Sequence, residues 1–431
     1  MPLDFAHGSV QWLTTDALNA TKAVTGLGFT PKALRFYWVG LQSNSPTNAA
    51  SGTVNERRGV GFAVSAVSRR CVGTYSLDGD NGGTDAGSVA NDDCVVVTVN
   101  GTGTVDGKLD INTFDTDGFT LIVDDVTPAN ITVFYEAWGG PDIVVATVGD
   151  IAEPGGTGTQ NYTVNGFTSD GLNQVVMLAG VQSVNALNTG QAQDSGMFVG
   201  FASSTSTTNN VVVCGNSDDA SDPTDTDGYC RQGECLAQVV IAGGTAVNAT
   251  ATLSAWGTDL FTLNWTARAT TNRRSIFLAI KGGTWQASSY TIAGNTLNST
   301  TTVSDLPFYL RGLSLIGRMT AQDTAGTSTL QDRIGMGSGR STTSRNSAGI
   351  LDNNNQDPTS VNTIVQYDSV LSFPSTGGGV QATYDINSFG LNSFQIIVDT
   401  AGGVASEFQG YLAFGDTMYP RNLSVGHPFI I

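Results

Sequence analysis

The chain has 431 residues, of which 40% are hydrophobic and only 13% are charged, and it contains 53 glycines. Its formal net charge of −18 would repel phosphate backbones, so the composition argues against a nucleic-acid partner. No apolar run approaches the roughly 18–20 residues that span a bilayer, so membrane insertion is not expected.

The N-terminal stretch MPLDFAHGSVQW lacks the basic and apolar regions of a secretory signal, which predicts synthesis in a cytoplasm. Beyond it, residues that alternate with period two dominate the chain. The runs at 95–101 and 237–244 are rich in β-branched residues and bounded by turn residues, as strands are. Glycine and asparagine suit tight turns and disfavour helices. We therefore predict an all-β fold.

The strand patterns recur three times in the same order. Each set has an opening strand, a Gly-bearing strand, a variable polar segment, a closing hairpin and a last strand. DINTF at 110–114 and DINSF at 385–389 begin the closing hairpin of the first and third sets, and the middle set has ATLSAW at 251–256. A phenylalanine follows five residues after the aromatic residue that ends each of these segments. These repeat landmarks are Phe119, Phe261 and Phe394.

The repeats predict three tandem antiparallel β-sandwich domains, because each contains many short strand signals separated by turns. Their predicted ranges are 1–140, 141–283 and 284–416, and an extended C-terminal arm at 417–431 follows them. The three landmark phenylalanines should occupy equivalent core positions. Strand alternation predicts that Ile111 and Thr113 face one side of the sheet, and that Asp110 and Asn112 face the other.

The landmarks resemble a repeat found in structural proteins of tailed bacteriophages. The similarity lies in GFTPKA at 28–33, DGFTL at 117–121, FTLNW at 261–265 and YLA at 411–413. The layout is also similar to that of the H-type, discoidin-like lectin domain, a small β-sandwich that works as a trimer. This second resemblance implies that three covalently joined copies could close into a pseudo-trimer. No sugar-binding residues carry over from it.

Few residues point to catalysis. His7 and His427 are the only two histidines, and neither lies in a recognised catalytic motif. Glutamate is scarce and no glutamate has an evident carboxylate partner, so we predict that the protein is not an enzyme. The tryptophans lie in or just after strand patterns, where we expect most of them to pack in the core or at the seams between repeats.

The variable segments of the first two repeats are rich in aspartate. They are DGDNGGTDAGSVANDD at 78–93 and SDDASDPTDTDG at 217–228. Closely spaced carboxylates in a Gly-rich loop can bind Ca²⁺, and the candidate ligands are Asp222, Asp225 and Asp227. Neither segment matches an EF-hand loop. An exposed, solvated acidic loop without metal is the alternative that the sequence favours, and no other cofactor is predicted.

The five cysteines also lie in these variable segments, and the third repeat has none. Their spacing fits no standard zinc-site pattern. Disulfides that flank the acidic segments are the preferred interpretation. Cys71 would pair with Cys94, and Cys214 would pair with either Cys230 or Cys235, in a particle that meets oxidising conditions after release.

The phage resemblance implies a non-enzymatic structural protein on the surface of a virion. We expect a tail-tip or fibre component that contacts host glycans or receptors through its variable loops, because recognition usually resides in loops on a rigid scaffold. The alternative is a capsid decoration or cement protein that binds neighbouring virion subunits. In either case other virion proteins, and other copies of this chain, are the expected partners.

Overall fold

The computed structural model describes most of the chain, and the statements below concern these residues. They are residues 2–79, 86–182, 184–192, 195–218, 225–239, 247–269, 273–293, 296–325, 327, 329–354, 356, 359–402 and 406–417. Within them the regular structure is β-strand, apart from the single 3₁₀ turn η1 (Thr207–Asn209). The predicted all-β class is confirmed. The C-terminal arm lies outside the described residues, except Thr417.

The strands form three successive units. Unit 1 contains β1 (Asp4–Trp12), β2 (Thr21–Thr25), β3 (Pro31–Trp38), β4 (Ala49–Ser51), β5 (Gly59–Ser65), β6 (Ser68–Ser76), β7 (Ala86–Asn91), β8 (Val96–Val99), β9 (Val105–Asp115), β10 (Gly118–Asp125) and β11 (Ile131–Gly139). Unit 2 contains β12 (Val145–Ala152), β13 (Gly158–Thr163), β14 (Gln174–Val181), β15 (Gln191–Ala192), β16 (Met197–Ala202), β17 (Asn210–Asp218), β18 (Asp225–Gln232), β19 (Leu236–Val239), β20 (Val247–Gly257), β21 (Leu260–Ala267) and β22 (Arg274–Lys281). Unit 3 contains β23 (Thr284–Ala293), β24 (Thr300–Val303), β25 (Phe308–Arg318), β26 (Thr329–Leu330), β27 (Asp332–Ser341), β28 (Ser344–Asp352), β29 (Val361–Gln366), β30 (Leu371–Pro374), β31 (Val380–Phe389), β32 (Phe394–Thr400) and β33 (Ser406–Thr417).

Each unit is a sandwich of a seven-stranded sheet and a four-stranded sheet with the same topology. In unit 1 the large sheet has the order β1-β11-β3-β5-β6-β7-β15 and the small sheet the order β2-β10-β9-β8. Units 2 and 3 repeat these orders with their own strands. The described strand pairs are antiparallel, and a two-residue turn joins consecutive strands in hairpins such as β5–β6, β9–β10 and β27–β28.

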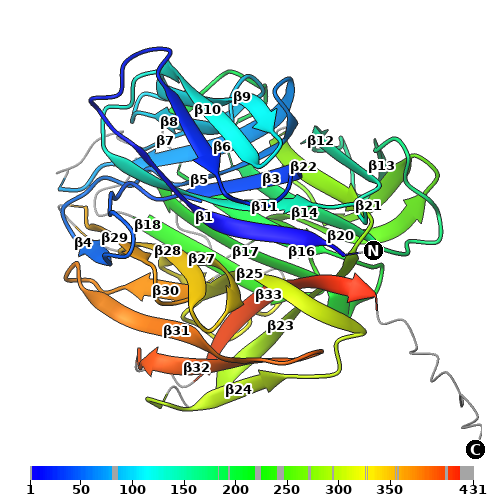
Figure 1. Cartoon of the computed structure of the whole chain (residues 1–431). Helices are drawn as coiled ribbons and strands as arrows, with labels where there is room; N and C mark the ends of the chain where they lie inside the picture. The colour runs from blue at the N-terminus through cyan, green and yellow to red at the C-terminus, as the bar shows by residue number, and fades with distance from the viewer. Residues whose placement is uncertain are drawn as a thin grey trace, which may run out of the picture.

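A short strand from another unit completes each large sheet. β15 of unit 2 pairs with β7 of unit 1, β26 of unit 3 pairs with β18 of unit 2, and β4 of unit 1 pairs with β29 of unit 3. The three exchanges run in the same direction and return to the first unit, so the units form a closed ring with pseudo-threefold symmetry. Figure 1 shows the three sandwiches packed side by side around a common centre.

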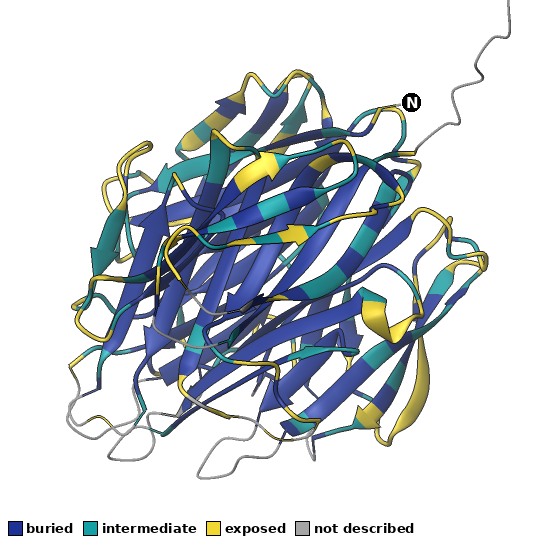
Figure 2. Ribbon diagram, turned by 90° about the horizontal axis from the view of Figure 1, so that it is seen from below, coloured by how far each residue is buried: buried dark blue, intermediate teal, exposed yellow. Residues whose placement is uncertain are grey.

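Four hydrophobic cores hold this ring together. One core lies inside each sandwich, and a fourth, which we call the axial core, contains buried residues from all three units. The large sheets are therefore buried on both faces, which explains why strands such as β11 and β14 read as continuous apolar runs. Figure 2 shows that most of these strands are buried, whereas exposed residues lie mainly in the turns and outer strands.

The landmark phenylalanines occupy the same position in the three small sheets. Phe119 pairs with Phe114 on β9, Phe261 pairs with Trp256 on β20, and Phe394 pairs with Phe389 on β31. All three landmark side chains are buried. DINTF and DINSF are therefore the same strand of two equivalent hairpins.

The predicted side-chain alternation within DINTF is wrong beyond Ile111. A β-bulge interrupts the register at Asn112, so that Leu121 pairs with Ile111 but Thr120 pairs with Thr113. Ile111 is buried whereas Thr113 is exposed, because the extra residue reverses the phase of the following side chains. The same bulge recurs at Ser254 and Asn387 in the other two hairpins.

The axis of the ring has two chemically different ends. The end at which β1 begins and β33 ends, which we call the base, is aromatic. There the Phe414 ring lies 4.6 Å from Phe5, 5.7 Å from Trp138 and 5.4 Å from Trp285, measured between ring centroids. These four side chains come from units 1 and 3. The opposite end is polar and is built around Arg58.

Candidate functional site

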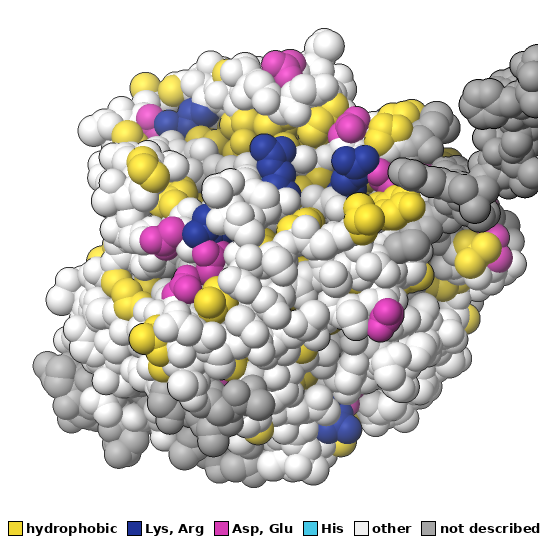
Figure 3. Space-filling view, turned by 60° about the horizontal axis from the view of Figure 1, so that its bottom comes forward, with side chains coloured by type: hydrophobic (Ala, Val, Ile, Leu, Met, Phe, Trp, Pro, Cys, Tyr) yellow, Lys and Arg dark blue, Asp and Glu magenta, His cyan; other side chains and the backbone are white. Residues whose placement is uncertain are grey.

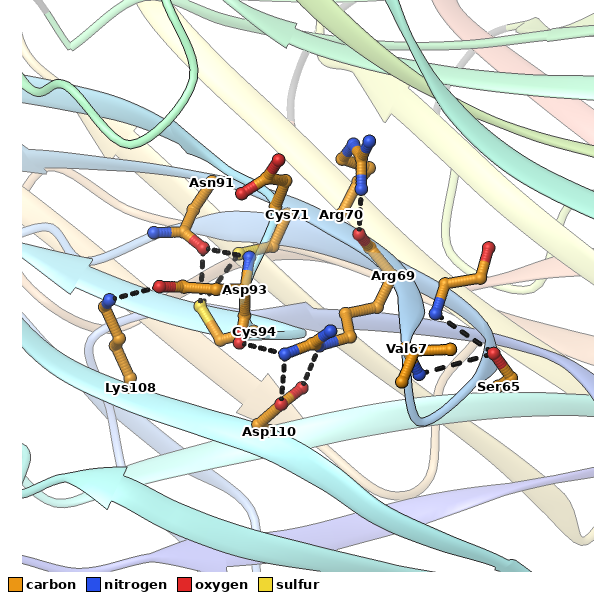
Figure 4. Close-up of polar contacts among 12 residues, drawn as sticks. Ser65, Val67, Arg69, Arg70, Cys71, Asn91, Asp93, Cys94, Lys108 and Asp110 are labelled. Carbon is orange, nitrogen blue, oxygen red and sulfur yellow. Dashed lines mark hydrogen bonds and ion pairs between the residues drawn. The ribbon is translucent and has the colours of Figure 1, made fainter.

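A buried pair of thiols lies between the two sheets of unit 1. Cys71 is on β6, and Cys94 lies in the connection between β7 and β8; both are fully buried. Their Sγ atoms are 3.4 Å apart, and the Cys94 thiol also lies 3.3 Å from Asn91 Oδ1. Figure 4 shows the two sulfur atoms side by side. The predicted partners are thus in contact as free thiols, because Cys71 pairs with Asn91 on the adjacent strand β7 and Cys94 follows that strand closely.

An arginine–aspartate pair flanks the thiols. Arg69 Nε donates to Asp110 Oδ1 at 2.9 Å, and its Nη2 donates to the carbonyl of Asp93 at 2.8 Å (Figure 4). Asp110 is the first residue of DINTF. The ion pair therefore ties the large sheet to the small sheet, which gives a physical reason for an aspartate at this position.

Unit 3 contains the same arrangement. Arg345 Nε lies 2.5 Å from Asp385 Oδ1, the first residue of DINSF, and donates to the carbonyl of Asp368 at 3.1 Å. Burial raises the pKa of Asp110 and of Asp385 to about 6 in each case, although the neighbouring arginine opposes the shift. The repeated DIN segment thus reflects a repeated inter-sheet ion pair.

We expect the protein to become more stable on mild acidification. Besides these two aspartates, burial raises the pKa of Glu407 to about 8, with Arg333 opposing. A carboxyl group whose pKa is higher in the folded than in the unfolded state takes up protons on folding, so its stabilising contribution is lost as the pH rises through the folded value. His7 acts in the opposite sense, since burial lowers its pKa to about 4, but one imidazole opposes three carboxyl groups.

The free energy of unfolding should therefore rise by on the order of 3 kcal/mol between pH 7.5 and pH 5. Denaturant titrations across this range measure the change. A double substitution of Asp110→Asn and Asp385→Asn should flatten the dependence between pH 4 and 6. A free energy that increases with pH across the whole range would contradict the assignment.

The predicted pairing of Cys214 with Cys230 is wrong. Cys214 pairs with Tyr229 across β17 and β18, so Cys214 and Cys230 point to opposite faces of the sheet. Cys214 lies in the sandwich core of unit 2, and Cys230 lies in the axial core. Cys235 shares the core of Cys214, but its thiol contacts the carbonyl of Ala251 at 3.5 Å. Sequence spacing could not reveal on which face each thiol lies.

The described parts of the two acidic segments lie largely in strands, whereas residues 80–85 and 219–224 lie outside the described residues. β7 begins at Ala86, and β18 begins at Asp225, so each segment contributes an edge strand that receives a strand from the neighbouring unit. Asp227 is only 3% exposed and pairs with Leu330 of unit 3. Asp222 lies outside the described residues. Among the residues that the structure describes, no three His, Cys, Asp or Glu side chains are grouped so that they could hold a metal ion.

The other residues considered in the sequence are structural where they are described. The six tryptophans are buried, as predicted for most of them. His7 Nε2 contacts the carbonyl and hydroxyl oxygens of Ser344 in unit 3, so this histidine lies at a seam between units. His427 lies outside the described residues.

Arg58 links all three units at the polar end of the axis. Its Nε lies 2.8 Å from Glu56 in its own unit, and its Nη1 donates to Asp332 of unit 3 at 2.7 Å. Its Nη2 donates to the carbonyl oxygens of Ser195 and Gly215 in unit 2, at 2.8 and 3.2 Å. Burial by itself lowers the pKa of Arg58, but Asp332 and Glu56 outweigh burial and raise it.

The three residues around Arg58 are equivalent positions of the ring. In each unit the residue at this position pairs with an equivalent residue of the neighbouring strand. The pairs are Glu56 with Ser76, Ser195 with Ser217, and Asp332 with Asp352. One cation from unit 1 thus neutralises two carboxylates that converge from two units. No pattern in the sequence marks this cluster, because its members lie far apart in the chain.

Two grooves lie between units near the base. The groove between units 3 and 1, about 420 Å³ in volume, combines two arginines with apolar side chains. Its lining includes Phe5, Phe29, Phe389, Arg311 and Arg340. The equivalent groove between units 1 and 2, about 360 Å³, is more apolar and is lined by residues of 31–32, 64–66, 114 and 143–146. These grooves were not predicted, because each is formed by segments of two units.

The described part of the chain contains no helix with the length and hydropathy of a membrane span. Comparison with models of protein families finds no family that matches the sequence, and comparison with curated proteins finds no relative that matches it. Function is therefore inferred from the ring, its grooves and the residues that line them.

Proposed function

We propose that this protein is a non-enzymatic structural component of the surface of a bacteriophage virion, where it binds other molecules through the rim of a rigid ring. The observation that carries the proposal is the closed exchange of β4, β15 and β26 between the three units. Buried side chains of all three units meet along its axis, and Arg58 forms ion pairs there with Glu56 and Asp332. The grooves and turns at its rim remain as binding surfaces.

Contact with the host is the first candidate role. The groove between units 3 and 1 offers half-buried aromatic rings, Phe29 and Phe389, beside the exposed Arg340. Aromatic and arginine side chains are the residues that most often anchor a bound partner. The two equivalent grooves differ in chemistry, so the partner need not have threefold symmetry.

Binding to a host surface can be tested with the purified full-length protein on a glycan array and on intact host cells. A double substitution of Phe29→Ala and Phe389→Ala should abolish binding. The matched control is Leu297→Ala, which truncates a 54% exposed side chain in the turn between β23 and β24. Binding that survives in the double variant would exclude this groove.

Capsid decoration is the second candidate, and exposed aliphatic side chains favour it. Val67 is 83% exposed, Val144 70%, Leu172 67% and Leu391 75%. All four lie in turns or connections near the base. Figure 3 shows hydrophobic side chains gathered in patches on a surface that carries few charges. Exposed apolar patches commonly mark protein–protein contacts.

Location on the particle separates these roles and tests the proposal itself. Mass spectrometry of gradient-purified virions should detect the protein, and immunogold labelling should place it on the head or on the tail. A Val144→Asp, Leu391→Asp variant should bind weakly to particles if the base is a capsid contact. The control Leu18→Asp changes a 57% exposed side chain in the turn after β1. Absence from purified virions would refute the virion assignment.

A further inference from the structure

The two cysteines of unit 1, Cys71 and Cys94, have counterparts at equivalent positions of unit 3, where both residues are serines. Cys71 pairs with Gly61, and Ser347 pairs with Gly337. A Cβ added to these glycines would meet the carbonyl oxygens of Val95 and Val370, respectively. Cys94 precedes Val95, and Ser369 precedes Val370. Cys94 of unit 1 and Ser369 of unit 3 therefore occupy equivalent positions.

In unit 3 the two equivalent side chains are joined by a hydrogen bond. The hydroxyl oxygens of Ser347 and Ser369 are 2.9 Å apart, and both side chains are buried. In unit 2 the corresponding residues are Val212 and Glu234, which offer no such link. The position thus brings two side chains together across the sandwich, and only unit 1 places thiols there.

We propose that Cys71 and Cys94 form a disulfide that locks the large sheet of unit 1 to the start of its small sheet, while Cys214, Cys230 and Cys235 remain thiols. The Sγ atoms must approach from 3.4 Å to about 2.0 Å, which small shifts of two side chains can supply. The three other cysteines are fully buried, and each contacts backbone or side-chain groups other than a second sulfur. This inference does not depend on the proposed function.

The bond would form by thiol–disulfide exchange with a small disulfide such as oxidised glutathione. One cysteine thiolate attacks the reagent and releases one glutathione, and the second cysteine then attacks the mixed disulfide and releases another. Two protein thiols are oxidised and one glutathione disulfide is reduced. Burial raises the pKa of Cys94, which disfavours the reactive thiolate in the closed fold. We therefore expect the bond to form during folding or during local opening of the β7 edge.

The proposed Cys71–Cys94 disulfide lies close to the junction between units 1 and 2. β7 receives β15 of unit 2, and Asn188 of unit 2 donates from its backbone to the carbonyl of Ala90 at 2.8 Å. The Asn188 side chain also donates to Asp92 at 2.6 Å. A disulfide at Cys94 would hold this receiving segment in place, and would therefore slow the opening of the junction between units 1 and 2.

The test refolds the full-length protein either with oxidised glutathione or with dithiothreitol, and then alkylates free thiols in denaturant. Mass spectrometry should count three alkylated cysteines after oxidation and five after reduction, with the peptides of Cys71 and Cys94 cross-linked. Five alkylated cysteines under both conditions would overturn the proposal. A cross-link that involves Cys214, Cys230 or Cys235 would overturn it as well.

Thermal unfolding and hydrogen exchange then test whether the disulfide stabilises the protein and slows the opening of the junction between units 1 and 2. The oxidised protein should melt a few degrees higher than the reduced protein, and amides of β7 and β15 should exchange more slowly. A Cys71→Ser, Cys94→Ser variant reproduces the pair found in unit 3 and should lose this redox dependence, whereas Cys214→Ser should retain it. Equal exchange rates in the oxidised and reduced proteins would refute the stabilising effect of the disulfide on the junction. If the serine variant does not fold, the count of alkylated cysteines in the unsubstituted protein still decides whether the disulfide forms.

Discussion

Replacing Arg58 with methionine is expected to lower the free energy of unfolding by about 3–5 kcal/mol, because it leaves buried carboxylates without their cation. Glu56 and Asp332 are 0% exposed, as is Arg58 itself. Equilibrium unfolding in guanidinium chloride measures the loss. Because the guanidinium contacts all three units, we expect the variant to weaken closure of the whole ring rather than of unit 1 alone.

An exposed ion pair provides the matched control. Arg311 pairs with Asp416 near the base, and half of its side-chain surface is exposed. Arg311→Met should therefore cost less than about 1 kcal/mol. Similar losses in Arg58→Met and Arg311→Met would show that the axial cluster is not a special source of stability.

A compensated variant separates charge from packing. Unit 2 has Met197 at the position equivalent to Arg58, and Ser195 at the position equivalent to Glu56 and Asp332. Combining Arg58→Met with Glu56→Ser and Asp332→Ser removes the cation and both carboxylates together. This triple variant should be more stable than Arg58→Met alone, since it also removes the two carboxylates that Arg58→Met leaves buried without their cation.

Truncating Phe119 to alanine is expected to cost about 3–5 kcal/mol, because a fully buried aromatic side chain leaves a cavity that the sandwich can fill only in part. Its ring lies 5.1 Å from the Tyr135 ring and 5.7 Å from the Phe36 ring, in edge-to-face geometry. Substitution of Phe261 or Phe394 should have a similar effect, since both occupy the same position of their own units. Chemical denaturation of the three single variants tests this equivalence.

The control for Phe119 lies directly opposite it on β9. Phe114 pairs with Phe119 but is only half-buried, so Phe114→Ala should cost clearly less. Equal costs for the two substitutions would contradict the assignment of Phe119 as a core residue. A much smaller cost at Phe261 or Phe394 would show that the units differ in how well they close around this ring.

The repeated architecture could be read from sequence because its landmarks are local. DINTF and DINSF retain both the inter-sheet aspartate and the aromatic residue that faces the landmark phenylalanine. Period-two patterning identified strands, since alternate side chains enter a core. The prediction failed within the same segment at Asn112, because a bulge adds one residue to one strand without leaving a distinctive residue type.

Part of the repeat was not recognisable in the sequence, because paired positions of units 1 and 2 have exchanged a large and a small residue. Trp38 of unit 1 corresponds to Gly180 of unit 2, while Gly59 corresponds to Phe198. A Cβ on Gly59 would collide with the Trp38 ring, and one on Gly180 would collide with the Phe198 ring. In both units an aromatic ring lies over a glycine of the neighbouring strand, but the ring and the glycine have exchanged strands. The filled volume is therefore similar, although the residue types at each aligned position differ.

The sequence by itself determined the all-β class, the threefold repetition and the core role of the landmark phenylalanines, because periodicity and turn residues act over a few neighbouring positions. Only the tertiary structure decided how the ring closes. The exchanged strands β4, β15 and β26 are two or three residues long, too short to show any periodicity. The Arg58 cluster likewise depends on which strand ends meet at the axis, and that is a property of packing between segments distant in the chain.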